Sequence, residues 1–297
     1  MYYNKTYKIV IIAITLILSV SVFAHPTGNM ITVGKHVLWS YINPIDDSEH
    51  HACVMIWSEG SEPEVLMTSV YAASDFMLYT NQKDIYIIER RHLQASQQFE
   101  IRILKTAIGK EPKVIWDWME DKWRIGEGGF FMVSDHQIVF ARYPNIYCMD
   151  KGKVPTPYFE FHKPISGMRF LANNQMLLLG NNSCWLVQQD GKIINQWDDL
   201  IDETVKNAPL NRNRIFDVDY HNEELLLAYW GKRSFEIIDK FGHRKTLLQQ
   251  QEPFTPHWVA FFGEEKLLFS SKLVFNGETP KPNLIKVKLD GNTAKVW

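Results

Sequence analysis

A unit of about 45 residues recurs six times along this chain, and this repeat restricts the fold more than any other feature of the sequence. The clearest copy holds four short segments rich in apolar residues and separated by polar turns, at 215–220, 224–230, 234–239 and 244–248. Four short strands at that period are typical of one blade of a β-propeller. The sequence therefore predicts an all-β fold, a six-bladed β-propeller of four-stranded antiparallel blades.

The second strand of each unit is its strongest marker, because it is a short apolar run that follows a polar turn. These runs begin at His36, Asp84, Gln137, Gln175, Glu224 and Lys266, which lie 48, 53, 38, 49 and 42 residues apart. The first unit is the weakest, because its 43–51 loop is long and acidic. A five-bladed or seven-bladed ring therefore remains an alternative. Since the first unit starts with its own first strand and the sixth ends with its own fourth, we expect the ring to close by face packing without an exchanged strand.

The N-terminal residues have the pattern of a secretory signal peptide. Lysines precede an apolar run over 9–18, and a segment ending at Ala24 offers acceptable residues before a cleavage site. A retained membrane anchor is the alternative, but the run is short for a span of about 20 residues. The sequence thus predicts a signal peptide over 1–24 and a single β-propeller domain over 25–297. It also predicts a secreted or periplasmic protein with no membrane span after cleavage.

The charge balance argues against one class of partner. Removal of Lys5 and Lys8 with the signal peptide leaves 30 basic residues against 34 acidic ones, a net charge of −4. A nucleic-acid-binding protein needs a concentrated basic face. We therefore expect no nucleic acid among the partners. As a separate expectation, the protein is predicted to be a monomer.

Three cysteines, Cys53, Cys148 and Cys184, are too few for a disulfide scaffold. Cys148 and Cys184 fall in the third strands of neighbouring units, so one bridge between them after export is conceivable. Three separate buried thiols are the alternative.

The fifth unit, over 216–242, resembles the repeats of NHL and YWTD six-bladed propellers in its order of aspartates, aromatic residues and glycine. The other units match this pattern only in outline. The resemblance implies the propeller fold. It also implies a choice of functions, because those families are mostly interaction modules with a minority of hydrolases and lyases.

Long loops are expected on one face of such a ring. In a propeller, the loops from fourth to first strands and from second to third strands gather around the mouth of the central channel. The first set here includes 117–129, 197–214 and 251–258, and the second includes 43–51, 91–98, 231–233 and 272–282. Within the first set, 198–205 is predicted to form a short helix with an acidic first turn. Long loops on one face of a rigid scaffold are where binding sites usually lie.

These loops carry the candidate ligand-binding residues. They are Trp118, Trp123, Arg124, Arg212, Arg214, Lys232, Arg233 and Trp258. Aromatic and arginine side chains are common anchors of recognition sites. The four cations Arg212, Arg214, Lys232 and Arg233 could form one spot that holds a carboxylate or phosphate. The alternatives are tryptophans that cap the packing of the blades and cations that are simply solvated.

Signals for catalysis are weaker. Glu127, Asp217 and His257 at the starts of first strands could form an acid/base group at the channel mouth. No Gly-x-Ser-x-Gly nucleophile elbow is present, and the glycines at 126–129 lack the Gly-Lys-Ser/Thr of a phosphate loop. We expect no cofactor.

A metal site is also weakly supported. The adjacent pair His50-His51, with carboxylates at 46–49, lacks the spacing of a metal site, and we expect no metal there.

The sequence therefore favours an exported propeller that binds a protein or glycan partner through its long-loop face. A propeller hydrolase or lyase with a carboxylate/His site at the channel mouth is the alternative.

Overall fold

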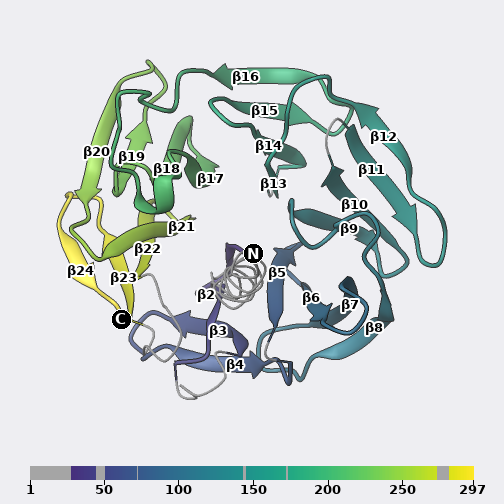
Figure 1. Ribbon diagram of the computed structural model, residues 1–297. Helices are drawn as coiled ribbons and strands as arrows, with labels where there is room; N and C mark the ends of the chain where they lie inside the picture. The colour runs from purple at the N-terminus through teal and green to yellow at the C-terminus, as the bar shows by residue number, and fades with distance from the viewer. Residues whose placement is uncertain (1–27, 45–50, 72, 143–144, 172, 273–280) are drawn as a thin grey trace, which may run out of the picture.

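The computed structural model describes residues 28–297, except 45–50, 72, 143–144, 172 and 273–280. Six four-stranded antiparallel sheets stand in a ring around a central channel (Figure 1). The predicted all-β six-bladed propeller is thereby confirmed. The signal peptide predicted over 1–24 lies outside the described residues.

Each blade consists of four strands that are consecutive in the chain, and the first strand lies nearest the channel. The strands are β1 (Met30–Val33), β2 (His36–Ile42), β3 (Ala52–Ser58), β4 (Glu64–Thr68), β5 (Ser74–Thr80), β6 (Ile85–Leu93), β7 (Gln98–Thr106), β8 (Lys113–Glu120), β9 (Phe130–Ser134), β10 (Gln137–Arg142), β11 (Asn145–Asp150), β12 (Thr156–Glu160), β13 (Gly167–Phe170), β14 (Gln175–Leu179), β15 (Cys184–Gln188), β16 (Ile193–Trp197), β17 (Ile215–His221), β18 (Glu224–Tyr229), β19 (Ser234–Ile238), β20 (Arg244–Gln249), β21 (Phe254–Phe262), β22 (Glu265–Lys272), β23 (Pro282–Val287) and β24 (Thr293–Lys295).

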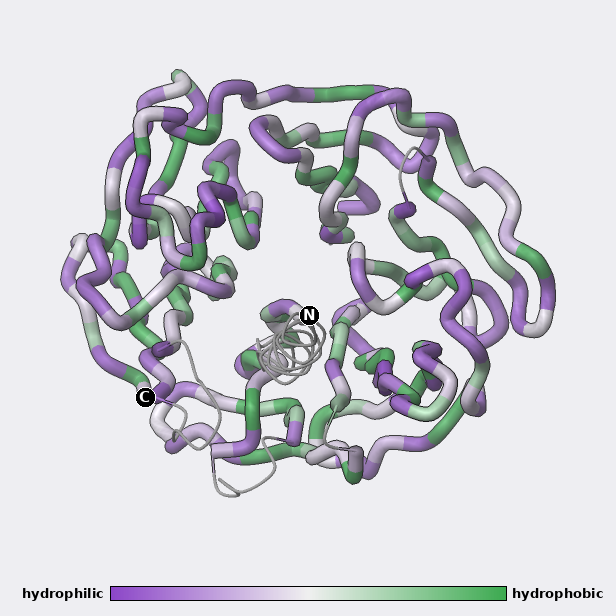
Figure 2. The backbone as a smooth tube through the Cα atoms, in the orientation of Figure 1, coloured by the Kyte–Doolittle hydropathy of each residue, from purple (hydrophilic) through white to green (hydrophobic). Residues whose placement is uncertain are grey.

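The burial of each strand follows from its place in the blade. Second strands are covered by neighbouring blades on both faces, so they are continuous apolar runs, and five of the six residues of β18 are buried. Fourth strands form the outer edge, and four of the five residues of β16 are exposed. Figure 2 shows the same pattern as hydrophobic stretches along the strands and hydrophilic stretches at many turns. Each fully buried Leu or Phe contributes about 1.5–3 kcal/mol, so packing between blades holds the ring together.

The ring closes by packing between the first and last blades. Neither blade exchanges a strand, since β1–β4 and β21–β24 each form a complete sheet. The ring centroids of Trp39 and Phe269 lie 6.0 Å apart, and those of Tyr41 and Phe269 lie 5.2 Å apart. The Trp258 indole N–H also donates to the Ser40 carbonyl at 3.2 Å. The predicted closure by face packing is therefore confirmed.

Several loop boundaries differ from those predicted. Strand β8 continues through Glu120, β6 continues to Leu93, and β21 begins at Phe254, so part of each of the segments 117–129, 91–98 and 251–258 is strand. In β8 the aromatic residues alternate with charged ones, and this period of two belongs to a strand with one face exposed.

The segment 198–205 forms no helix, and the prediction of one is wrong. Its backbone N–H groups instead bond to neighbouring strands and loops. Leu200 N–H donates to the Asn182 carbonyl at 3.2 Å, and Asp202 N–H donates to the Tyr229 hydroxyl at 2.7 Å. These tertiary bonds replace the bonds within a helix that the acidic first turn would have favoured.

The three cysteines are free thiols. Cys53 and Cys184 are fully buried, whereas Cys148 is partly exposed. The conceivable bridge between Cys148 and Cys184 is therefore not present, and the alternative of three buried thiols is correct for Cys53 and Cys184 but not for the partly exposed Cys148.

Candidate functional site

The central channel has a cavity at each end. On the loop side, where fourth-to-first and second-to-third connections emerge, the cavity has a volume of about 400 Å³. On the hairpin side, where first strands turn into second strands, it has a volume of about 620 Å³. Asn29, Met168 and Arg169 line both cavities, so these residues mark the floor between them.

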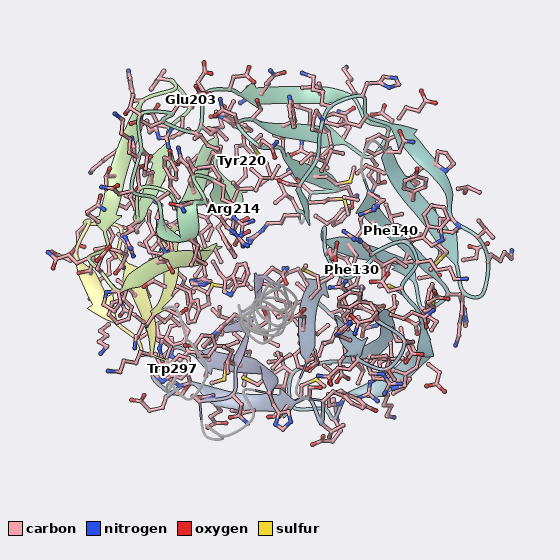
Figure 3. The ribbon with its side chains drawn as sticks, viewed as in Figure 1. Phe130, Phe140, Glu203, Arg214, Tyr220 and Trp297 are labelled. Atoms are coloured by element: carbon pink, nitrogen blue, oxygen red, sulfur yellow. The ribbon has the colours of Figure 1, made fainter. Side chains whose placement is uncertain are left out.

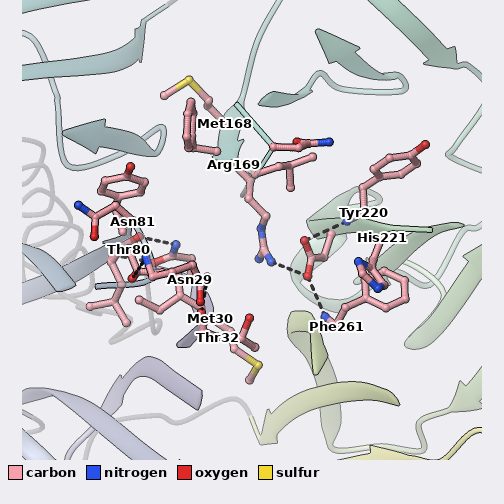
Figure 4. A pocket seen from close by; sticks show the side chains of 18 of the residues that line it. Asn29, Met30, Thr32, Thr80, Asn81, Met168, Arg169, Tyr220, His221 and Phe261 are labelled. Atoms are coloured by element: carbon pink, nitrogen blue, oxygen red, sulfur yellow. Dashed lines mark hydrogen bonds and ion pairs between the residues drawn. The ribbon is translucent and has the colours of Figure 1, made fainter. Parts of the chain in front are cut away.

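An ion cluster forms that floor. Arg169 in β13 donates from Nη2 to both carboxylate oxygens of Asp217, at 3.0 and 2.8 Å, and its Nη1 lies 3.2 Å from Oδ2 of Asp219. Both aspartates also accept a backbone N–H bond from β21: Asp217 accepts from Val259 at 3.0 Å. Asp219 accepts from Phe261 at 2.8 Å (Figure 4). The cluster therefore ties together three blades that are neighbours in the ring, those that begin with β13, β17 and β21.

Burial is the main influence on Asp217. It raises the pKa of the Asp217 carboxyl to about 6, while the Arg169 charge and the Val259 N–H act to lower it. Only 13% of the side-chain surface is exposed for Asp217 and for Arg169. Because its oxygens are already committed to Arg169 and to backbone N–H groups, Asp217 is a structural partner rather than a free base.

A second ion cluster stands at the wall of the loop-side cavity. Arg90 in β6 donates to Glu127 at 2.7 Å, and its Nε lies 3.3 Å from the Asp121 carboxylate. The Arg90 guanidinium also lies over the Phe99 ring, 3.6 Å from its centroid. Arg124 reaches Glu127 at 3.5 Å. Glu127 is therefore held between two guanidinium groups.

Arg214 differs from the other two arginines among the described residues that line this cavity. Its side chain is exposed at the edge of the channel (Figure 3), and no carboxylate of the described chain lies within 4 Å of it. The guanidinium lies over the Phe216 ring, 4.6 Å from its centroid. Phe216 in turn stacks on Trp230 at 5.0 Å with an interplanar angle of 19°. Partial burial and the nearby Arg212 lower the pKa of Arg214.

The four cations predicted to form one spot do not form it, because two of them are paired with carboxylates and only one of the four lines the cavity. Lys232 pairs with Asp202 at 3.0 Å, and Arg233 pairs with Glu252 at 2.8 Å. Arg212 is exposed near Arg214 but does not line the cavity. Arg214 is therefore the one of the four that faces the cavity.

The candidate tryptophans are engaged in packing. Trp118 lies in β8, where the guanidinium groups of Arg91 and Arg102 lie 3.9 and 4.8 Å from its centroid. Trp123 contacts Tyr147, with centroids 5.7 Å apart. Trp258 lies in β21 and is 2% exposed. The alternative that these rings cap the packing of the blades fits the structure better than exposed binding platforms.

His257 is separated from the other acid/base candidates. Its side chain is fully buried in β21 among aromatic rings, with centroids 5.2 Å from Phe216 and 5.1 Å from Trp230. It does not line the loop-side cavity, whereas Glu127 and Asp217 do. The structure therefore does not bring the three residues into one accessible site.

The hairpin-side cavity is lined mostly by residues of the first strands, and the turn residues Asn81 and Asn222 among them are already hydrogen-bonded within the protein. Oδ1 of Asn81 accepts the N–H groups of Lys83 and Asp84 at 3.0 and 2.7 Å, and Asn222 donates to both Glu264 oxygens at 2.9 Å. The loop-side cavity is the better candidate, because it holds an exposed cation without a carboxylate partner in the described chain.

Sequence reasoning missed Arg169 and Arg90. A signal for Arg169 was present, because Asp217 and Asp219 are two residues apart in one strand and so face the same side. Two carboxylates on one face of an inner strand need a cation, and a lone arginine interrupts the apolar residues of β13. The sequence could not indicate which strand supplies that cation, because the partner depends on which blades are neighbours in the ring.

The described residues meet neither the requirements of a metal site nor those of a membrane-spanning helix. They contain no group of three or more His, Cys, Asp or Glu side chains arranged to hold a metal. No helix within them is long and apolar enough to cross a membrane. The His50-His51 candidate falls mostly outside the described residues.

Comparison with known proteins shows the fold alone. No protein-family model and no curated protein matches the chain. A chain of the nidogen/laminin complex is similar with a TM-score of 0.54 and 14% identity, over 87% of this chain and 91% of that one. A catalytically inactive virginiamycin B lyase from Staphylococcus aureus with quinupristin gives 0.49 and 11%, over 89% and 97%. A puromycin hydrolase mutant gives 0.48 and 10%, over 92% and 53%. The similar structures thus include both a protein complex and enzymes.

Proposed function

We propose that this protein is an exported, monomeric binding module that recognises a protein partner through the loop side of its propeller. The observation that supports this best is which of the charged groups at the loop-side cavity are paired and which are not. Its carboxylates, Glu127 and Asp217, are engaged by arginines, while the exposed cation Arg214 has no carboxylate partner in the described chain. Such a cavity is arranged to bind a group and not to transfer a proton.

A protein partner fits the loop side better than a glycan does. Sugar rings are recognised by exposed aromatic faces, and Trp118, Trp123 and Trp258 are packed against other side chains. The exposed apolar residues on this side include Val70 at 76% and Leu210 at 36%. Arginine is one of the residue types that most often anchor protein interfaces, and exposed apolar residues add contact area around such an anchor. The fold is compatible with this use, since a chain of the nidogen/laminin complex shares it.

The enzyme alternative receives less support from the geometry. An acid/base mechanism needs a group within hydrogen-bond reach of a substrate and free to exchange a proton. Glu127 lies between Arg90 and Arg124, and His257 is buried outside the cavity. We therefore place recognition first.

The proposal is tested by disrupting each side of the ring separately. The double variant Val70→Asp/Leu210→Asp places charge on the loop side, and Phe241→Asp places it at the turn after β19 on the hairpin side, where Phe241 is 73% exposed. The three proteins are immobilised and exposed to an envelope and culture-supernatant fraction of the source organism, and retained proteins are quantified by mass spectrometry. We expect a partner retained by the wild type and by Phe241→Asp but lost by the loop-side variant. Equal retention by all three would refute a loop-side interface.

A further inference from the structure

We propose that Arg214 is the anchor of the site and binds the carboxylate of an acidic side chain that a protein partner inserts into the loop-side cavity. This inference rests on the proposed function and specifies its chemistry. Three arginines line the cavity among the described residues. Arg90 is paired with Asp121 and Glu127, and Arg169 is paired with Asp217 and Asp219. The positive charge of Arg214 is the one left without a carboxylate in the described chain.

Arg214 is also held in place before a ligand arrives. Its guanidinium lies over Phe216, Phe216 stacks on Trp230, and the Trp230 indole N–H donates to the Pro209 carbonyl at 3.0 Å. The centroid of the Phe216 ring lies 4.6 Å from the guanidinium carbon, and no carboxylate of the described chain takes the N–H donors along the guanidinium edge. A carboxylate can accept two parallel hydrogen bonds from that edge. Because the contact with Phe216 already restricts the side chain, less side-chain freedom is lost on binding.

The charges around the cavity favour a carboxylate over a phosphate. Glu127 and Asp217 line the same cavity and are paired with Arg90 and Arg169, so Arg214 is the one uncompensated charge of this lining and a second charge on the ligand would have no partner there. Arg212 lies outside the lining, so one guanidinium faces one anionic group. The ligand group expected at Arg214 therefore carries a single negative charge and is planar, as a carboxylate is.

The shape of the site favours a group that enters end-on. The cavity lies at the mouth of the channel, and the Arg169 cluster forms its floor. A protruding side chain fits such a depression, whereas a polysaccharide would need a groove across the face.

The test uses peptides selected from a random display library against the immobilised mature protein. We expect the selected peptides to share an Asp or Glu, and replacement of that residue by Asn or Gln to weaken binding at least about 10-fold. Arg214→Gln should produce the same loss, and combining the two changes should add little further loss, because both remove one interaction. Arg214→Lys should fall between, since it keeps the charge without the fork.

Arg142→Gln is the matched control, because Arg142 ends β10 on the same side but does not line the cavity, and it should bind within twofold of wild type. In competition, N-acetylglutamate amide should displace the peptides and its glutamine counterpart should not. Displacement by glucuronate alone would overturn the inference in favour of a glycan, and displacement by inorganic phosphate alone would overturn the preference for a carboxylate.

The outcomes separate this inference from the function on which it rests. Peptides that are lost with Val70→Asp/Leu210→Asp but bind Arg214→Gln as tightly as wild type would overturn the role of Arg214 and leave the loop-side interface standing. Peptides that bind without dependence on either variant, or a selection that yields no binder, would overturn both. Thermal melting of each variant shows whether it is folded.

Discussion

Replacing Arg169 with methionine should destabilise the propeller strongly, because it leaves two carboxylates in the channel without their cation. Arg169 bonds Asp217 and lies 3.2 Å from Asp219, and the side chains of all three are 13% exposed. Removing one partner of a buried ion pair costs about 3–5 kcal/mol, because the remaining charge stays desolvated. We expect a loss of this order in the free energy of unfolding at pH 8, measured by urea denaturation of residues 25–297.

The loss should depend on pH in a defined direction. In the wild type, burial raises the pKa of Asp217 to about 6, above its ordinary value of 3.8. The folded state therefore binds this proton more tightly than the unfolded state, and its contribution to stability falls as the pH rises from about 4 to about 6. Without the Arg169 charge, which acts to lower it, the folded-state pKa of Asp217 rises further, so the penalty of the variant should be large at pH 8 and smaller at pH 5.

Two controls make this prediction specific. Arg124→Met removes an exposed guanidinium, 56% accessible and 3.5 Å from Glu127, and should cost less than about 1 kcal/mol. The triple variant Arg169→Met/Asp217→Asn/Asp219→Asn leaves no unpaired charge and should recover part of the loss. An Arg169→Met protein within about 1 kcal/mol of wild type at pH 8, or equally destabilised at both pH values, would refute the electrostatic argument.

Two further predictions concern packing. Alkylation of the native protein should modify Cys148 fastest, because Cys53 and Cys184 are buried and burial raises the pKa of the Cys53 thiol to about 12. Three alkylated cysteines after denaturation would agree with free thiols, whereas one alkylated cysteine would indicate a disulfide bridge. An intact mass beginning at His25 would agree with signal cleavage. Gly129→Ala should lower the melting temperature far more than Gly152→Ala. Both glycines have positive φ, 88° and 76°, so both substitutions strain the backbone. A Cβ at Gly129 would in addition lie 2.0 Å from the Met168 carbonyl oxygen, whereas a Cβ at Gly152 meets nothing within 4 Å. Equal shifts in the two melting temperatures would show that this close approach of blades carries no cost.

The alanine at Gly152 serves as the measure of backbone strain alone, about 1–3 kcal/mol for a residue held at positive φ. For a domain of this size each kcal/mol lowers the melting temperature by roughly 2–4 °C. The additional shift in Gly129→Ala therefore reports the contact between the blade that begins with β9 and the blade that begins with β13.

The architecture could be predicted from the sequence because its signals are local. The apolar run of β18 and the turns beside it are set by neighbours within a few residues, and the period of such units indicated the number of blades. Loop boundaries were less accurate, because the mixture of charged and aromatic residues in β8 resembles an exposed loop. Only the alternation of exposed and packed positions along that strand reveals that it is the outer edge of a blade.

The candidate site was decided by tertiary structure. The sequence by itself determined that arginines, carboxylates and tryptophans would gather near one face of a ring, because every blade presents its loops in the same direction. It did not determine their partners. Arg169 meets Asp217 48 residues away, and Asp202 takes Lys232 out of the predicted cationic spot.

Arg214, by contrast, has no carboxylate within 4 Å in the described chain and rests on Phe216. These pairings arise from the order in which blades pack around the channel, and a charge becomes available for binding only where that packing leaves it without a partner.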